Sequence, residues 1–410
     1  MKKIITKLFI CFVGLFFVNL TCFLYPNGLR AEEPNIYYQR GAKLAIPSAG
    51  FELKLRTELA SYYSFTNYSA FKTRTTNSIQ PDSKNSFDIQ RANIITAGNV
   101  ADKRFSYFIK YEAIKTNLGI YGDLFNSADP EHSGKLSETW GQWNAPNNYA
   151  KLRVGKQKIP LGLQRAMQDT ELQFVTPALS NQVMFGVFDT NLNEKNKIIT
   201  LEDKNTGIMG QSVTPYKNLL ISWTTGIFNQ EPGTNSNTNV LGLLGVNLVS
   251  NDYDRTVEGD RQYSQALAWT AGISATVTRL NLERRTVDVL NGALDFGLKY
   301  RGFSWQSEGL INYANAGRHG DAVNLGYYTQ FGYFIVPQLQ ELAIRFSGID
   351  FDKGFSQKAG FEYSLVYNYY LVGEFLKFQA GLAYYDLKMS LANSEKYQVF
   401  KGLVGVSGVF

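Results

Sequence analysis

Short segments in which apolar and polar side chains alternate recur along most of this chain, and they restrict the folds open to it. Leu53, Leu55 and Leu59 alternate with charged residues, and the same period of two returns around 105–112, 294–301, 341–346 and 361–369. A period of two is typical of β-strands with one apolar and one polar face. Beyond the first residues, no apolar run reaches the ~20 residues of a membrane helix. The sequence therefore predicts an all-β protein.

A transmembrane barrel and a large soluble β-sandwich would both show this alternation. Strands long enough to be tilted spans, and aromatic residues at strand ends in a chain with 28 Phe and 25 Tyr, favour the barrel. Tight connections such as 100–103 and 336–338 also alternate with long polar ones. The long ones are Thr66–Asn85, Thr116–Lys135, Lys156–Asp203 and Glu231–Arg261. This order is typical of an antiparallel up-and-down outer-membrane barrel with short periplasmic turns and longer external loops.

The alternation predicts about 16 strands, each long enough for a span of about 9–11 residues. They lie near 51–65, 86–99, 104–115, 136–145, 149–156, 205–214, 217–229, 263–278, 281–289, 292–301, 303–314, 322–335, 339–350, 358–370, 375–387 and 396–410. The ninth, Asn281–Val289, carries Glu283, Arg284 and Arg285, which is a high charge for a lipid-facing strand. An even count places both termini on the periplasmic side.

The N-terminus predicts a secretory signal peptide over residues 1–31. Basic Lys2 and Lys3 precede an apolar run, and Ala31 precedes an acidic, proline-containing start. An uncleaved anchor helix is the alternative. Both cysteines, Cys11 and Cys22, lie in this segment, so the mature chain has none for a disulfide or a thiolate site. The segment holds four bases and no acid, so cleavage lowers the net charge of +6 to +2, and nucleic acid is not implied. Residues 32–50 would form a short periplasmic lead, and 51–410 the barrel.

The stretch from Lys156 to Asp203, after the fifth strand, is the longest without a sustained period. Pro160 cannot donate to a ladder, and Gly155 and Gly162 release the backbone, so the strand ends there. We expect this long loop to fold into the barrel lumen, because long loops in compact proteins are usually functional. The residues proposed for a basic, anion-binding constriction are Lys156, Lys158, Arg165, Arg153, Arg56 and Arg345. Alternatively, these bases pair with Asp169 and Glu171 and hold the loop to the wall.

Several segments, taken in order, resemble the phosphate-selective porin O and P family. They are Phe87–Asn93, Leu152–Gly162, Leu172–Val175, Asn205–Gly210, Tyr300–Ser304 with Glu308, Gly332–Pro337 and Glu341–Arg345. The resemblance implies a 16-stranded porin, usually a homotrimer, in the outer membrane of a Gram-negative-type bacterium. Its loop after strand five would narrow the pore. Implied partners are small anionic or polar solutes such as phosphate, outer-membrane lipids and the barrel assembly machinery.

Chemistry other than passage through a pore finds little support in the sequence. The two histidines, His132 and His319, fall in predicted external loops, whereas a hydrolase in the barrel wall would need its histidine on a strand. Glycine-rich phosphate loops and metal-ligand spacings are absent, so no enzyme activity, metal or other cofactor is expected. Two function classes remain: a passive porin for small solutes, or a surface adhesin or receptor that binds through its long loops and conducts little.

The last residue, Phe410, ends an alternating run that contains Val404 and Val406. A terminal aromatic residue on the last strand resembles the recognition signal that outer-membrane barrels present during assembly. We therefore expect Phe410 to act as an assembly signal.

Overall fold

The computed structural model describes most of the chain. The described ranges are 35–38, 41–71, 83–115, 134–146, 149–184, 186–189, 197–200, 204–230, 239–250, 253–282, 285–315, 321–351, 359–371, 376–389 and 395–410. The predicted signal peptide, His132 and His319 lie outside these ranges. No helix within them is long and apolar enough to cross a membrane.

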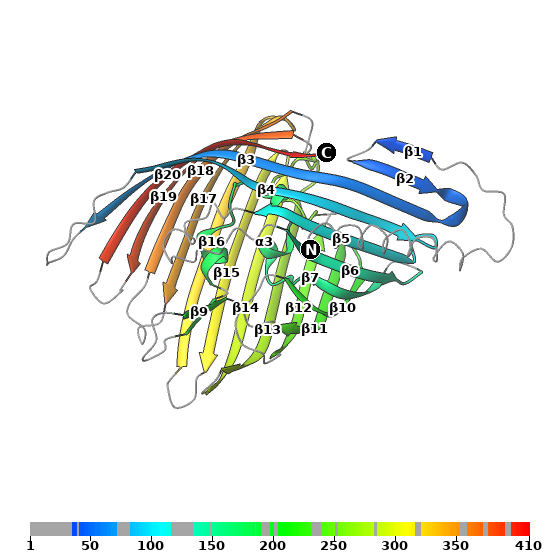
Figure 1. Ribbon diagram of the computed structural model, residues 1–410, viewed down its shortest axis with the longest axis horizontal. Helices are drawn as coiled ribbons and strands as arrows, with labels where there is room; N and C mark the ends of the chain where they lie inside the picture. Colours follow the sequence, from blue (N-terminus) through cyan, green and yellow to red (C-terminus); the bar gives the residue numbers. More distant parts are fainter. Residues whose placement is uncertain are drawn as a thin grey trace, which may run out of the picture.

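The predicted β-barrel is confirmed: in the described part of the chain, 16 antiparallel strands close into one barrel (Figure 1). The strands are β3 (Phe51–Phe71), β4 (Ser83–Val100), β5 (Phe105–Lys115), β6 (Lys135–Asn144), β7 (Ala150–Lys158), β10 (Lys204–Tyr216), β11 (Leu219–Gln230), β12 (Asn239–Ser250), β13 (Ala268–Leu282), β14 (Arg285–Tyr300), β15 (Phe303–Asn315), β16 (Asp321–Val336), β17 (Gln340–Phe351), β18 (Ala359–Tyr370), β19 (Leu376–Met389) and β20 (Glu395–Val409). Each pairs with the next along the chain, and β20 pairs with β3. Closure leaves no open edge among these strands.

Two strand assignments made from the sequence are wrong. Residues 239–250 were placed in an external loop but form β12, and the predicted eighth, ninth and tenth strands are only two, β13 and β14. β12 escaped detection because both of its faces are apolar: Leu241 and Leu243 are buried, while Val240 and Leu244 are exposed. β14 looked like two strands because Asn291-Gly292 interrupts it. That pair resembles a turn but continues in the ladder opposite Ile311 and Asn312.

The tight turns lie together at one end of the barrel, here called the turn end, and the long connections lie at the other, the loop end. Tight turns include 101–104, 217–218, 301–302 and 337–339. Each end has one exception. β13 ends at Leu282 and β14 begins at Arg285, so the connection at the loop end is short there. At the turn end, β12 and β13 are joined by a long connection, whose described residues 253–267 we call the turn-end connector.

Two segments of the predicted lead (residues 32–50), 35–38 and 42–46, take part in the sheet. β1 (Asn35–Tyr38) pairs with β2 (Ala42–Ile46), and β2 pairs with Phe51–Leu55 at the start of β3. A short 3-10 helix, η1 (Pro47–Ala49), and Gly50, with φ +56°, turn the chain from β2 into β3. Because β20 pairs with β3 only from Glu58 onward, β2 continues the sheet beyond the C-terminus (Figure 1).

Phe410 closes the last strand through its backbone. Its N–H donates to the carbonyl of Thr57 (2.8 Å), and its carbonyl accepts from the N–H of Thr57 (2.7 Å). Deleting Phe410 removes both bonds and should cost about 1–3 kcal/mol of barrel stability. The urea midpoint of protein refolded in detergent measures this loss.

The variant Phe410→Ala keeps both backbone bonds and removes only the aromatic ring. If the ring is an assembly signal, this variant should keep its urea midpoint yet yield less heat-modifiable barrel in cells. Normal assembly of Phe410→Ala would show that the ring is incidental.

Candidate functional site

The barrel strands carry two different faces, and β14 shows both. Asn291, Asp295 and Lys299 are buried, whereas Leu290 and Leu294 are exposed, Leu294 by 65%. The alternation recurs on most of the other strands. Transmembrane barrels have this polarity, with apolar side chains toward lipid and polar ones toward the interior. We call the surface formed by the buried polar rows the polar face.

The chain leaves β7 after Lys158, and residues 159–184, here called the long-loop segment, cross the polar face. Gly162 has φ +76°, a conformation that favours glycine, and its N–H donates to the Ser274 hydroxyl on β13 (2.9 Å). A Cβ at this position would collide with the carboxylate of Glu308. The strand therefore ends where Pro160 and Gly162 predict, and the backbone comes close to the wall.

Three short helices follow: α3 (Leu163–Ala166), η2 (Asp169–Glu171) and α4 (Leu179–Val183). None of them has a side-chain cap of its own. At α3 and α4, carboxylates of the wall take that role instead. Glu308 on β15 accepts from the N–H of Leu163, and Glu362 on β18 accepts from the N–H of Leu179 at 2.7 Å. Unpaired N–H groups at a helix start favour such an anionic acceptor.

Gln173 is the most extensively bonded of the buried amides in the long-loop segment. Its side-chain nitrogen donates to Glu341 (2.6 Å) and to Ser304 (3.0 Å). Its backbone carbonyl accepts from the side-chain amides of Asn368 and Gln379, both at 3.0 Å. A buried polar group without a partner costs about 1–3 kcal/mol, so these bonds favour one position of the segment strongly.

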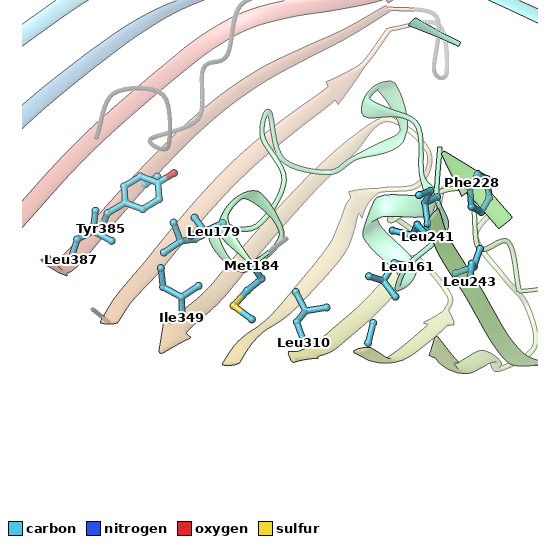
Figure 2. Packing of buried hydrophobic residues seen from close by; sticks show 14 of the residues in the cluster. Leu161, Leu179, Met184, Phe228, Leu241, Leu243, Leu310, Ile349, Tyr385 and Leu387 are labelled. Carbon is cyan, nitrogen blue, oxygen red and sulfur yellow. The ribbon is translucent and has the colours of Figure 1, made fainter. Parts of the chain in front are cut away.

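Apolar side chains complete the attachment toward the loop end. Figure 2 shows Leu161, Leu179 and Met184 of the long-loop segment packed with residues of the wall. The labelled wall residues are Phe228, Leu241, Leu243, Leu310, Ile349, Tyr385 and Leu387. This contact explains why the inward face of β12 is apolar at Leu241 and Leu243.

Lys158 ties the start of the segment to its own later turn. Its ammonium donates to the Met167 carbonyl (2.8 Å) and lies 3.5 Å from the carboxylate of Asp169. Arg91 of β4 lies 3.6 Å from the same carboxylate. Burial alone would raise the pKa of Asp169, but the positive charges of Lys158 and then Arg91 outweigh it and hold that pKa well below its usual range. For Lys158, this geometry agrees with the alternative in which the bases pair with acidic residues of the loop and hold it to the wall.

Arg345 and Arg153 are also engaged. The guanidinium of Arg345 donates to Glu362 (2.9 and 2.6 Å) and to the carbonyl of Thr176 (2.9 Å), and it lies over the ring of Phe174. Arg345 therefore fastens the long-loop segment to β17. Arg153 donates twice to Gln142 and stacks on Trp140, 3.9 Å from the ring centroid.

The other predicted bases are dispersed. Arg56 lies at the turn end of β3, 3.7 Å from Glu58. Arg165 is half-buried on α3. Lys156 stands opposite Thr139 and Thr206, both exposed, in the row that also contains exposed Val154. This register places Lys156 on the apolar, outward face, so its predicted place in a constriction is wrong.

Sequence reasoning missed the turn-end connector, because residues 231–261 had been assigned to an external loop. Its Glu258 is fully buried and accepts from the side-chain amide of Gln164 (2.8 Å) and from the N–H of Gln173 (2.5 Å). Arg261 forms an ion pair with Glu171. The apolar run 240–249, too long for an exposed loop, was the available signal that a strand precedes this connector. Within the described ranges, no group of three or more His, Cys, Asp or Glu is placed to hold a metal ion.

Comparison with solved structures places this architecture among outer-membrane channels. The chain is similar to the anion-selective porin from Comamonas acidovorans, with 10% identity and a TM-score of 0.58, covering 88% of this chain and 100% of that one. It is also similar to the outer membrane channel DcaP of Acinetobacter baumannii (9%, 0.55, covering 88% and 98%) and to OprB of Pseudomonas putida (7%, 0.51, covering 87% and 94%). At these identities the likeness concerns the fold alone.

The sequence family is established independently of those structures. No curated protein sequence matches the chain. The family model of phosphate-selective porin O and P matches residues 63–404, which is most of the chain. The chain therefore belongs to this family and is an outer-membrane channel protein.

The ion pair between Arg345 and Glu362 allows a direct test of the attachment. Replacing Arg345 with Met leaves the Glu362 carboxylate buried beside the segment without its cation, which should cost about 3–5 kcal/mol. The double variant Arg345→Met/Glu362→Gln should lose much less. Urea unfolding followed by tryptophan fluorescence measures both, and equal losses would contradict a coupled pair.

The link between Lys158 and Asp169 should depend on pH. Because the pKa of Asp169 is lower in the folded protein, the link contributes fully above the unfolded pKa of about 3.9 and is lost as the pH falls through the lower folded value. The Asp169 side chain is 41% exposed, so solvent screening limits the effect. Hydrogen exchange of residues 167–172 should show acid-dependent loss of protection, compared at each pH with Asp169→Asn. Identical pH profiles would contradict the link.

Proposed function

We propose that this chain forms a water-filled channel through which small solutes diffuse, that the long-loop segment narrows it, and that it favours anions, phosphate among them. Family membership supports a channel. The narrowing of the channel and its preference for anions are inferred from how the long-loop segment is attached. We also expect a homotrimer surrounded by outer-membrane lipids, as the sequence resemblance implies.

The observation that carries the proposal is that the hydrogen bonds of the long-loop segment concentrate on one side of the barrel. Most of these bonds join it to β15, β17, β18 and β19, and through Arg91 to β4. Toward β11–β13 it has the apolar contacts near the loop end and one bond to Ser274. A cavity of about 220 Å³ lies between Pro160, Gly162 and Ala166 of the segment and strands β7 and β10–β13. We infer that solutes pass on this side.

A base stands at this cavity. Lys151 of β7 lines it and is exposed, and no carboxylate in the described part of the chain forms an ion pair with it. Arg153 follows two residues later on the same face of the strand. Basic groups lining a pore favour anions. The neighbour from Comamonas acidovorans is described as anion-selective, and we propose the same selectivity here on the strength of Lys151 and Arg153.

The remaining predicted bases have a different role in this proposal. Lys158 and Arg345 hold the long-loop segment against the wall, because their charges are matched by Asp169 and Glu362. A matched pair presents little net charge to a passing ion. We therefore expect selectivity to come mainly from Lys151, the exposed base at the cavity.

Reversal potentials in planar bilayers under a salt gradient test the proposal. The wild-type channel should prefer anions, and Lys151→Gln should move it toward cations. One unit charge about 4 Å from a passing ion contributes about 1 kcal/mol in bulk water and about 4 kcal/mol at an effective dielectric constant of 20. Lys156→Gln is the matched control, since Lys156 lies on the same strand but on the outward face.

The possible results separate the anion channel from its alternatives. Absence of conductance from correctly folded protein would favour the adhesin or receptor alternative. Equal shifts from Lys151→Gln and Lys156→Gln would contradict the assigned solute path. Cation preference in the wild type would contradict the anion channel.

A further inference from the structure

We propose that the cavity between the long-loop segment and strands β10–β13 is a binding site, rather than only a passage, for a small solute that carries one phosphate or carboxylate group on a polar body. The inference rests on the proposed function and goes beyond it. A passage favours a class of ions, whereas a binding site is saturable and recognises one shape of molecule.

The turn-end connector, which contributes Arg255 to the lining of the cavity, is fixed to the barrel. The ammonium of Lys299 on β14 donates to the carbonyls of Asp254 (2.8 Å) and Val257 (2.6 Å). The buried carboxylate of Asp260 accepts from the N–H of Ser264 (3.0 Å) and from the N–H of Gly302 (2.8 Å). The connector is therefore fastened on both sides of Arg255, the base that it presents to the cavity.

The connector and the long-loop segment are also fastened to each other. Glu258 accepts two bonds from the segment, and its own N–H donates to the carbonyl of Glu171 (3.3 Å). Arg261 adds the ion pair with Glu171. Two elements that come from opposite ends of the barrel, and that both contribute residues to the lining, are thus fastened to each other. A lining held in this way is suited to bind a solute without first having to be ordered.

The side chain of Arg255 is oriented by hydrogen bonds to the barrel wall. Its guanidinium donates to the hydroxyl of Thr270 (2.5 Å) and to the carboxylate of Asp295 (2.9 Å), and its side chain is 18% exposed. These bonds use two of the five N–H donors of the guanidinium, and its planar fork suits the oxygen pairs of phosphate and carboxylate groups. Lys151 supplies a second positive charge to the same cavity from β7.

Polar, uncharged side chains form part of the remaining lining, beside apolar residues such as Val213 and Trp223. Gln211, Ser222, Thr224 and Asn247 of β10–β12 line the cavity. Amides and hydroxyls of this kind bind hydroxyl groups of a solute. Since a water molecule takes up about 30 Å³, a cavity of about 220 Å³ is too large for a bare monatomic ion to fill. Asp295 would repel a second negative group beside Arg255, so a solute charged at one end fits best.

Block of the chloride current in single-channel recordings tests this site with three probes. Glycerol phosphate carries both the anionic group and the polar body, inorganic phosphate only the first, and glycerol only the second. Glycerol phosphate should block in a saturable manner and at the lowest concentration. Inorganic phosphate should block more weakly, and glycerol should not block.

Two variants separate recognition from net charge. Lys151→Gln removes one charge, while Arg255→Gln/Asp295→Asn removes the guanidinium without altering the net charge. Each should weaken block by glycerol phosphate about tenfold, the effect expected for the loss of a hydrogen bond to a charged group. The control Lys217→Gln/Arg301→Gln removes two exposed bases of the turn end outside the cavity and should leave block unchanged. Heat-modifiable migration shows that each variant is folded.

The outcomes distinguish this inference from the proposed function. A wild-type channel that prefers anions but is not blocked in a saturable manner would overturn the binding site and leave the anion channel standing. Because the Lys151 side chain is exposed, Lys151→Gln should fold normally. Unchanged block by glycerol phosphate in this variant would also overturn the binding site. A wild-type channel without anion preference would overturn the proposed function itself.

Discussion

The structure depends on carboxylates of the barrel interior that accept hydrogen bonds from the long-loop segment. Glu258, Glu308 and Glu362 are buried, and each accepts from a backbone N–H of that segment. A buried carboxylate without partners is costly, and so is a helix start without acceptors. The carboxylates and the N–H groups of the segment therefore supply each other's hydrogen-bond partners. Neither would be stable in its observed form alone.

The chemistry of the interior follows from this mutual satisfaction. On the side where most of its hydrogen bonds lie, charged side chains hold the segment in place. Arg345, for example, contacts both Glu362 and the Thr176 carbonyl. In the proposed channel, solutes pass along β7 and β10–β13, where the turn-end connector adds Arg255. The interior is thus asymmetric, with an anchoring side and a side where Lys151 is exposed. This asymmetry cannot be deduced from total charge, because it depends on which bases have partners.

Much of the fold could be predicted from a period of two, because a barrel strand with one lipid face and one polar face must alternate. The prediction failed where that condition fails. β12 is apolar on both faces, since Leu241 and Leu243 pack against the long-loop segment. The position of the long loop after strand five was predictable from Pro160 and Gly162. The turn-end connector was not, because its place depends on recognising β12 first, and Glu258 could not be assigned a partner without it.

The candidate site shows why local chemistry alone does not identify pore residues. Lys151 and Lys156 belong to the same strand and are five positions apart, which is an odd number, so they lie on opposite faces. Sequence reasoning favoured Lys156 because it stands next to the loop, but the ladder opposite Thr206 turns it outward. Lys158, two residues on, lies beyond the register of the neighbouring β6 strand and bends back to Asp169. Proximity to the loop therefore decides which bases anchor it, whereas the phase of the strand decides which bases a solute meets.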